Sequence, residues 1–299
     1  MGGVAARRGR WAVVATALGL LPVGLLPLGL LPSAALAQAG GARMPIFDAH
    51  LHYSHDAWES VPPKTAIEIL RQAGVMRALV SSSNDEGNQM LHAEAPDLIL
   101  PSLRTYRTRA EVSTWARDET VIPYLQERLK KYRYVAIGEF HLFGADADLP
   151  VPRRMVQLAR EHNLFLHAHS DVDAIERLFR QWPQARILWA HSGFERPDAV
   201  RAVLRRHSNL WADLAFRSEQ GTVSNGVGKV ESEWRAAFME FPDRFLVGTD
   251  SYVPERWHYV GGNADFSRAW LGDLPKDIAE RIGWRNGETL FSGKLVKKQ

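Results

Sequence analysis

Apolar residues gather in eight short runs along the chain, and polar or charged positions follow the apolar part of most runs. The runs are rich in Val, Ile, Leu, Phe and Trp, without strict alternation of apolar and polar residues. This pattern predicts short β-strands that are buried on both faces. We expect these strands at 44–52, 76–83, 98–106, 134–143, 164–170, 185–194, 210–218 and 244–252.

Amphipathic stretches separate the predicted strands, most clearly at 152–163, 173–183, 197–208 and 231–242. Their apolar residues recur at helical spacing. Eight strands that alternate with helices over about 250 residues predict a single α/β domain, a (β/α)8 TIM barrel. A doubly wound open sheet is the alternative, but no glycine-rich phosphate-binding turn follows any strand. The long connections at 219–231 and 253–267 are expected either to bind substrate or to be plain surface loops.

The N-terminal segment follows a different pattern. Three arginines at 7–10 precede an apolar run at 11–31, and Ala-Leu-Ala at 35–37 fits a cleavage site. These features predict a signal peptide at 1–37, a barrel at 38–299, and an exported periplasmic or secreted protein. The paired arginines leave twin-arginine export open beside the ordinary route. An uncleaved membrane anchor is the alternative, which Pro22, Pro27 and Pro32 and the Ala-Leu-Ala site disfavour.

Composition then narrows the classes of function. The chain has 37 Lys and Arg against 34 Asp and Glu, and the excess of three lies within 1–37. The remaining chain is formally neutral, which argues against nucleic-acid binding and favours a small-molecule substrate. We expect no stable membrane insertion once 1–37 is removed, and the oligomeric state stays open. The chain contains no cysteine, so disulfides and thiolate metal ligands are excluded.

Charged and imidazole side chains occur near the ends of the predicted strands, which form the active-site face of a barrel. Side chains two residues apart on a strand share a face. On the first strand this rule points Asp48, His50 and His52 the same way. On the other strands it leads from Val135 and Ile137 to Glu139 and His141, from Phe165 to His167 and His169, from Ile187 and Trp189 to His191, and from Leu246 and Gly248 to Asp250.

Taken alone, each of these residues has an ordinary interpretation. A single strand histidine such as His191 is typical of a hydrogen-bonded core, and Asp250 before a loop is typical of a cap or turn. His50 and His52 are more informative, because strand alternation places both imidazoles on one side of one ion. Six histidines, one glutamate and one aspartate are expected at one level of the barrel. Buried without partners they would be costly, and a divalent cation removes that cost.

Five strand-end motifs, DAHLH, IGEFH, FLHAHS, WAHSGF and VGTDSY, occur in this order, and NGETLF follows near the C-terminus. With them the chain from Pro45 to Phe291 resembles the amidohydrolase superfamily of metal-dependent (β/α)8-barrel hydrolases, and especially its amidohydrolase-related branch. The resemblance implies one or two divalent ions. Nitrogen and oxygen ligands suit Zn, Mn, Fe, Co or Ni, with zinc the default.

The resemblance also implies roles for the motif residues. His50 and His52 resemble the first-strand ligands of the more buried ion, and Asp250 resembles the eighth-strand ligand that doubles as general base. Glu139 stands where relatives place a bridging carboxylate. His191 and, by its position, His167 resemble the ligands of a second ion. His141 and His169 depart from the pattern and are expected to support ligands or contact substrate, whereas His55 is expected to be a loop residue.

The predicted function is hydrolysis of an ester, lactone or amide by a metal-activated water, with Asp250 and His191 as catalytic residues. One alternative is a mononuclear decarboxylase of an aromatic acid, which Glu139 disfavours. Another is an exported binding protein without activity. Asp48 and Asp213 are candidates to orient imidazoles. Arginines and aromatic residues near strand ends suggest a substrate with a carboxylate or a ring, although each arginine could equally be a rim residue: Arg104, Tyr106, Arg107, Arg217, Tyr252, Arg256 and Trp257.

Overall fold

The structure, a computed structural model, describes residues 43–217, 223–226 and 228–293. The predicted signal segment at 1–37 lies outside these residues, and the loop predicted at 219–231 lies only partly within them. In the part of the chain that is described, no helix is long and apolar enough to cross a membrane.

Eight parallel strands form one sheet in which each strand pairs with the next along the chain. The ring closes between the last strand and the first. The Ala49 N–H donates to the Val247 carbonyl at 2.9 Å, and the Asp250 N–H donates to the His50 carbonyl at 2.7 Å. All eight predicted strands are confirmed, although each is shorter than predicted, the last three most of all: β1 (Ile46–Leu51), β2 (Val75–Ser81), β3 (Ile99–Leu103), β4 (Ala136–Leu142), β5 (Phe165–Ser170), β6 (Ile187–Trp189), β7 (Leu210–Asp213) and β8 (Phe245–Leu246).

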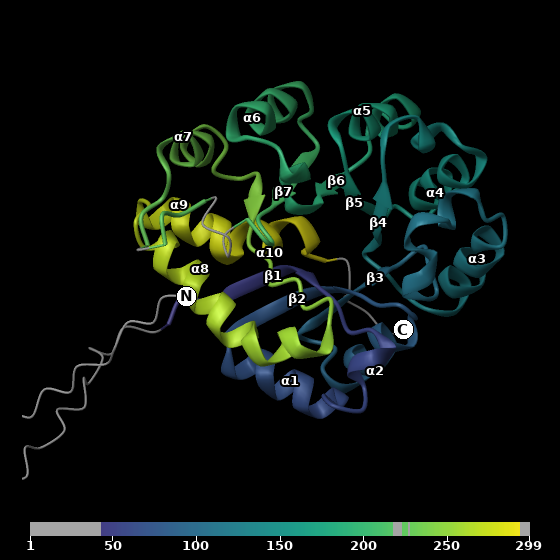
Figure 1. The fold of residues 1–299 in the computed structure, drawn as a ribbon, viewed down its shortest axis with the longest axis horizontal. Coiled ribbons are helices and arrows are strands. Elements are labelled where there is room, and N and C mark those ends of the chain that lie inside the picture. The colour runs from purple at the N-terminus through teal and green to yellow at the C-terminus, as the bar shows by residue number, and fades with distance from the viewer. Residues whose placement is uncertain (1–42, 218–222, 227, 294–299) are drawn as a thin grey trace, which may run out of the picture. The chain divides into compact units, whose positions relative to one another are not determined.

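Helices surround the sheet on its outer side, which completes the predicted single (β/α)8 barrel (Figure 1). In helix α5 the N-cap Asp171 accepts a hydrogen bond from the Ala174 N–H at 2.8 Å, and one face buries Ile175 and Leu178. Proline stands in the first turn of α1, α4 and α6, where no backbone donor is needed. The helices are α1 (Pro63–Gln72), α2 (Glu86–Glu94), α3 (Val121–Lys131), α4 (Pro150–Glu161), α5 (Val172–Gln181), α6 (Pro197–Arg206), α7 (Ser232–Glu240), α8 (Val260–Leu271), α9 (Lys276–Glu280) and α10 (Asn286–Phe291).

The apolar core has two layers. The larger layer fills the space between sheet and helices. The smaller one lies inside the ring and includes Phe47, Leu100 and Leu246 from three strands. Helix α10, which carries the NGETLF motif, adds Phe291 to this inner layer. The Phe291 ring stacks on Phe47, with centroids 5.7 Å apart, and packs against Phe165 at 4.8 Å. The barrel interior is therefore a packed core beneath the site.

The rule of alternation holds for β5 and β8 but is wrong on other strands. On β4 the inner layer contains Ala136, whereas Ile137 packs outward. On β6 it contains Leu188, whereas Ile187 and Trp189 pack outward. An irregular register between Gly138 and Phe140 is the reason on β4, because it inserts one residue that has no partner on β5.

On β1 the rule holds for His50 and His52, which point into one group, but it fails below His50. On β1, Phe47 and Ala49 belong to the inner layer. The register with β2 shifts between Asp48 and Leu51. The Asp48 carboxylate accepts bonds from the Thr249 hydroxyl at 2.6 Å and from the His50 N–H at 3.1 Å. Asp48 thus joins β1 to the segment after β8 and does not orient an imidazole.

The contact between α10 and the inner layer makes a prediction about stability. A Cβ added at Gly287 would lie 2.2 Å from Cγ of Phe47. Gly287→Ala should therefore lower the free energy of unfolding by about 1–3 kcal/mol, as overpacking does. The control is Gly262→Ala in α8, where nothing lies within 4 Å of the added Cβ. It should be neutral or stabilise by up to about 1 kcal/mol, because alanine is the better helix former.

Urea unfolding followed by circular dichroism measures both changes. Equal effects of Gly287→Ala and Gly262→Ala would contradict the close packing of α10 beneath the barrel.

Candidate metal centre

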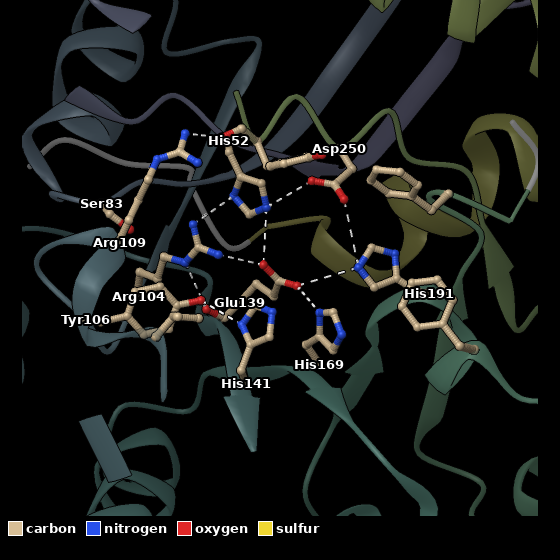
Figure 2. A pocket seen from close by; sticks show the side chains of 14 residues that line it. His52, Ser83, Arg104, Tyr106, Arg109, Glu139, His141, His169, His191 and Asp250 are labelled. Carbon is tan, nitrogen blue, oxygen red and sulfur yellow. Dashed lines mark hydrogen bonds and ion pairs between the residues drawn. The ribbon is translucent and has the colours of Figure 1, made fainter. Parts of the chain in front are cut away.

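A cavity of about 420 Å³ opens at the carboxyl ends of the strands. Figure 2 shows polar side chains that converge on Glu139 in its centre. Nine of the residues predicted from the sequence line this cavity, and they come from six strands or the segments that follow them: His52, Arg104, Tyr106, Glu139, His141, His169, His191, Asp250 and Tyr252.

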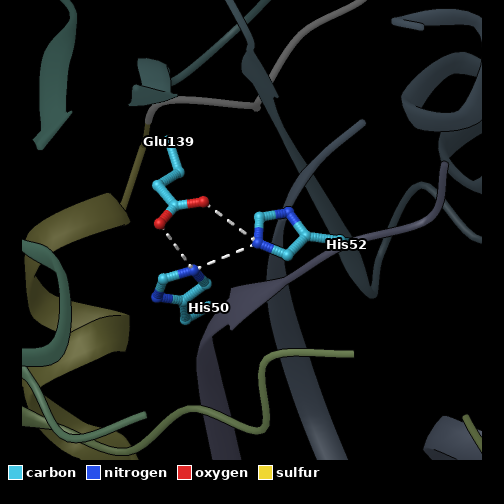
Figure 3. Close-up of side chains that lie close together, drawn as sticks. All are labelled: His50, His52 and Glu139. Atoms are coloured by element: carbon cyan, nitrogen blue, oxygen red, sulfur yellow. Dashed lines mark hydrogen bonds and ion pairs between the residues drawn. The ribbon is translucent and has the colours of Figure 1, made fainter. Parts of the chain in front are cut away.

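The first group of potential metal ligands consists of His50, His52, Glu139 and Asp250. The Nε2 atoms of His50 and His52 lie 3.2 Å apart (Figure 3). Oε2 of Glu139 is 3.2 Å from Nε2 of His52, and Oε1 is 3.5 Å from Nε2 of His50. Oδ1 of Asp250 is 3.3 Å and 3.9 Å from the same two nitrogens. Ligand atoms about 2.0–2.1 Å from one tetrahedral ion would lie roughly 3.4 Å apart, so this donor set fits a divalent cation.

The Nδ1 atoms of His50 and His52 are held by hydrogen-bond acceptors. Nδ1 of His52 donates to the Ser81 carbonyl at 2.8 Å, and Nδ1 of His50 donates to Oδ2 of Asp213 at 3.1 Å. A backbone carbonyl or an ionised carboxylate accepts only, so each Nδ1 carries the proton. In the neutral ring each Nε2 presents a lone pair toward the group, as a metal ligand must, and a proton carried there by a charged ring has to leave before metal binds.

A second group consists of Glu139, His169 and His191. Nδ1 of His169 lies 2.7 Å from Oε1 of Glu139, and Nε2 of His191 lies 3.7 Å from the same oxygen. Nδ1 of His191 donates to the Ala215 carbonyl at 2.9 Å, which leaves Nε2 as the acceptor. The Glu139 carboxylate thus faces both groups, and each group could hold a cation.

His191 reaches the cavity because the backbone turns after β6. His191, Ser192 and Gly193 have φ values of 54°, 52° and 64°, a left-handed conformation that is unusual for residues with side chains. A Cβ at Gly193 would lie 2.1 Å from the Trp189 ring, so this position requires glycine. Because Leu188 is the inward residue of β6, regular alternation would have pointed His191 outward, and the turn returns it to the cavity where the sequence predicted it.

The fifth strand brings His169, and not His167, to the cavity. Sequence position favoured His167 as the ligand. Its Nε2 instead lies 3.1 Å from Oδ2 of Asp213, and within the described chain its Nδ1 has no partner. Residues two apart on a strand differ by roughly 6.5 Å in height, so His167 lies one layer deeper than His169. Burial lowers the pKa of His167 to about 4, and the ring is neutral at pH 7.

Two further pairs surround Glu139. Nη2 of Arg104 is 2.7 Å from Oε2 of Glu139, and Arg104 is buried. The Tyr106 hydroxyl lies 2.9 Å from Nδ1 of His141, whose ring stacks on His169 with centroids 4.0 Å apart. Burial lowers the pKa of His141 to about 3, so its ring is also neutral. The Arg104–Glu139 pair fixes the carboxylate itself, and the Tyr106–His141 pair fixes the His141 ring beside it.

Some predicted residues lie away from the cavity. Trp257 is fully buried against Tyr53, with ring centroids 5.4 Å apart. Arg217 packs over the Trp234 ring at 5.2 Å and donates to the Glu195 carbonyl. Nδ1 of His55 lies 3.0 Å from the Ser83 carbonyl, which agrees with a loop role for this histidine.

Sequence reasoning missed Ser83, Arg109, Phe194 and Phe216, which line the cavity. Ser83, Phe194 and Phe216 lie at or just after predicted strands, so their position was a usable signal. Arg109 follows β3 by six residues and offered no such signal.

Three buried carboxylates, Asp213, Glu139 and Asp250, surround His50. Burial opposes a charged ring, yet these carboxylates raise the pKa of His50 well above its ordinary value. Burial would also raise the pKa of Asp250, but His50 and His52 outweigh it and bring this pKa to about 2. The group therefore requires positive charge at its centre, which a proton or a metal ion supplies.

The comparisons with known proteins identify the family of the chain and support its fold. Residues 47–292 match the family model described as Amidohydrolase. The chain belongs to the amidohydrolase family, as the motifs indicated, and it is a metal-dependent hydrolase. No curated protein sequence matches the chain.

Solved structures with similar folds include a TatD homologue from Escherichia coli. It is 17% identical, with a TM-score of 0.58, and the match covers 82% of this chain and 97% of that one. An uncharacterised TIM-barrel protein from Bordetella bronchiseptica is 14% identical, with a TM-score of 0.52, and the match covers 77% of this chain and 82% of that one. At these identities the two structures support the fold alone.

The charge balance predicts how metal affinity depends on pH. With its raised pKa, His50 is protonated at neutral pH in the metal-free protein, and a cation at its nitrogen must displace that proton. Affinity should therefore increase with pH, by about tenfold per unit while one proton is released. Calorimetric titrations in buffers of different ionisation enthalpy count the released protons. Binding without proton release would contradict this account.

Asp213 provides a second prediction. Asp213→Asn keeps the shape but replaces one acceptor oxygen by an amide donor, which should turn or detach the His50 ring. Divalent metal affinity should fall by about 10- to 100-fold. Competition with a chromogenic chelator measures it, with the exposed Asp198→Asn as control. Equal affinities in the two variants would show that Asp213 does not support the centre.

Proposed function

We propose that this protein hydrolyses a carboxylic ester, a lactone or an amide of a small molecule. The observation that carries the proposal is the set His50, His52, Glu139 and Asp250: the two Nε2 atoms lie 3.2 Å apart, and carboxylate oxygens of Glu139 and Asp250 lie 3.2–3.9 Å from these nitrogens. This spacing suits one divalent ion, with zinc as the default and Mn, Fe, Co or Ni also compatible.

Glu139, His169 and His191 are proposed to hold a second ion. Here His169 replaces His167, which the sequence favoured, because Nδ1 of His169 lies 2.7 Å from Oε1 of Glu139. A divalent ion in such a site lowers the pKa of water toward about 7 and polarises the scissile carbonyl. Proton transfer and positioning of the reacting groups are proposed for the side chains of the site.

Asp250 is proposed as the general base. Within the described residues its Oδ1 accepts no hydrogen bond, and its backbone N–H is tied to the His50 carbonyl at 2.7 Å. The backbone at Asp250 is thus held firmly, so that Oδ1 faces the proposed ion and Oδ2, on the His191 side, is left to take a proton from the attacking water. The same carboxylate then returns the proton to the leaving group.

His191 and Arg104 support the reaction from either side of Glu139. The Nε2 atom of His191 lies 3.9 Å from Oδ2 of Asp250 and faces the cavity. Arg104 holds Oε2 of Glu139 and keeps the carboxylate in position.

Export is proposed separately, on the sequence at 1–37 alone, with the periplasm or the exterior as the destination.

The proposal is tested by a substrate screen of metal-reconstituted protein with lactones, esters, N-acyl amino acids, phosphoesters and aromatic acids. Release of acid and alcohol or amine supports the proposal. Release of CO2 from an aromatic acid would establish the decarboxylase in its place, and binding without turnover across the panel would favour a binding protein. Metal analysis accompanies the screen, because full activity with one ion per chain would exclude the two-ion form.

Substitution of Asp250 tests its role as the base. Asp250→Asn retains an oxygen that can bind metal but cannot accept the proton, so kcat per bound metal ion should fall by about 10²- to 10⁴-fold. Turnover is normalised to metal content measured by mass spectrometry. Asp243→Asn, at the opposite end of β8 and exposed, is the matched control. Turnover that survives in Asp250→Asn would eliminate this mechanism.

A further inference from the structure

One wall of the cavity presents buried polar atoms that lack partners. Ser83 is fully buried, and its Oγ has no hydrogen-bond partner among residues 43–217, 223–226 and 228–293. Within the same ranges, Nε of Arg109 is also buried without a partner. Both residues line the cavity. Buried donors without acceptors are costly, so these two indicate that a ligand oxygen completes the wall.

Arg104 adds a third donor to this wall. Its Nη1 lies 3.4 Å from Nδ1 of His52, but that nitrogen already donates to the Ser81 carbonyl. Nη1 carries two N–H bonds, so it can still donate to a ligand in the cavity. In Figure 2, Ser83, Arg104 and Arg109 lie to one side of Glu139, and His191 lies to the other.

The opposite wall is aromatic. Phe194 stacks on His191 with centroids 4.7 Å apart, and Phe216 lies 5.9 Å from the same ring. Tyr252 continues this wall at 5.7 Å from Phe216. All three rings line the cavity, so a ligand beside the metal centre contacts donors on one side and rings on the other.

The charges of the polar wall favour an acceptor with a single negative charge. Arg109 already pairs with Asp56 at 2.7 Å, and Arg104 pairs with Glu139 at 2.7 Å. Each guanidinium is thus balanced, and the wall offers hydrogen-bond donors with little surplus positive charge. A carboxylate suits such a wall better than a phosphate dianion, because the dianion needs more compensating charge.

We propose that Ser83 and Arg109, assisted by Arg104, form a carboxylate subsite of the substrate cavity. The inference rests on the proposed function and deepens it: the substrate carries a carboxylate away from the scissile bond and an aromatic or bulky apolar group. With a small movement of the Ser83 and Arg109 side chains, the carboxylate oxygens accept from Ser83 Oγ, Arg109 Nε and Arg104 Nη1. The apolar group lies against Phe194, Phe216 and Tyr252.

The test compares two probes that cannot be hydrolysed, 3-phenylpropanoate and 3-phenylpropan-1-ol. Calorimetry with the metal-loaded full chain should show the carboxylate binding about tenfold or more tightly than the alcohol, as a charge-assisted hydrogen bond implies. In Ser83→Ala and Arg109→Gln this ratio should fall toward one. Arg109→Lys should retain part of it, because the charge remains.

The control is Arg117→Gln, an exposed arginine paired with Asp146 outside the cavity, which should leave the ratio unchanged. The subsite is refuted if Ser83→Ala and Arg109→Gln keep the wild-type ratio, since direct binding of the carboxylate to the metal would then explain it. It is also refuted as a carboxylate site if inorganic phosphate competes more strongly than 3-phenylpropanoate and loses that advantage in Ser83→Ala.

Hydrolysis of a neutral ester, phenyl acetate, separates the two proposals. Metal-dependent cleavage of phenyl acetate together with equal binding of both probes would retain the hydrolase and reject the subsite. The expected binding ratio together with no cleavage of any substrate in the panel would retain the subsite and reject the proposed reaction.

Discussion

The buried carboxylate of Asp213 connects the parts of the barrel mouth on which the metal centre depends. Its Oδ2 accepts from Nδ1 of His50 and Nε2 of His167, both at 3.1 Å. Its Oδ1 accepts from the N–H of His191 at 2.9 Å and of Ala215 at 3.1 Å. One acid on β7 thus fixes an imidazole on β1, a deeper imidazole on β5 and the backbone turn after β6. Burial disfavours its charge, but these partners keep its pKa well below the ordinary value.

The candidate ligands reach their places through departures from regular strand geometry. Glu139 occupies the irregular position of β4, His191 follows β6 in a left-handed turn, and Asp250 has a φ of 48°. Each departure needs support from its neighbours. Gly193, in the turn after β6, packs against the Trp189 ring. The Asp250 N–H donates to the His50 carbonyl. Such sites in a fold are where local rules of sequence are expected to fail, because function determines the local geometry.

The cavity has different chemistry on its two sides. The β2–β3 side carries Ser83, Arg104 and Arg109, whereas the side near His191 carries Phe194 and Phe216. Glu139 lies between them and contacts Arg104 on one side and His169 on the other. This arrangement underlies the proposal of a substrate that is polar at one end and apolar at the other. The barrel supplies the frame, and the segments after the strands supply the selectivity.

The sequence by itself determined the barrel, the order of its strands and most of the residues at its mouth. Eight continuous apolar strands with helices between them are compatible with few other folds. Polar groups at the carboxyl ends of parallel strands meet on one face of the barrel. The choice between His167 and His169 was different. Strand alternation points both side chains inward, but it does not tell which of them reaches the level of the cavity. Only the tertiary structure set one against Asp213 and the other against Glu139. It also removed Trp257 and Arg217 from the site and brought in Arg109, because loop paths depend on packing and not on strand period.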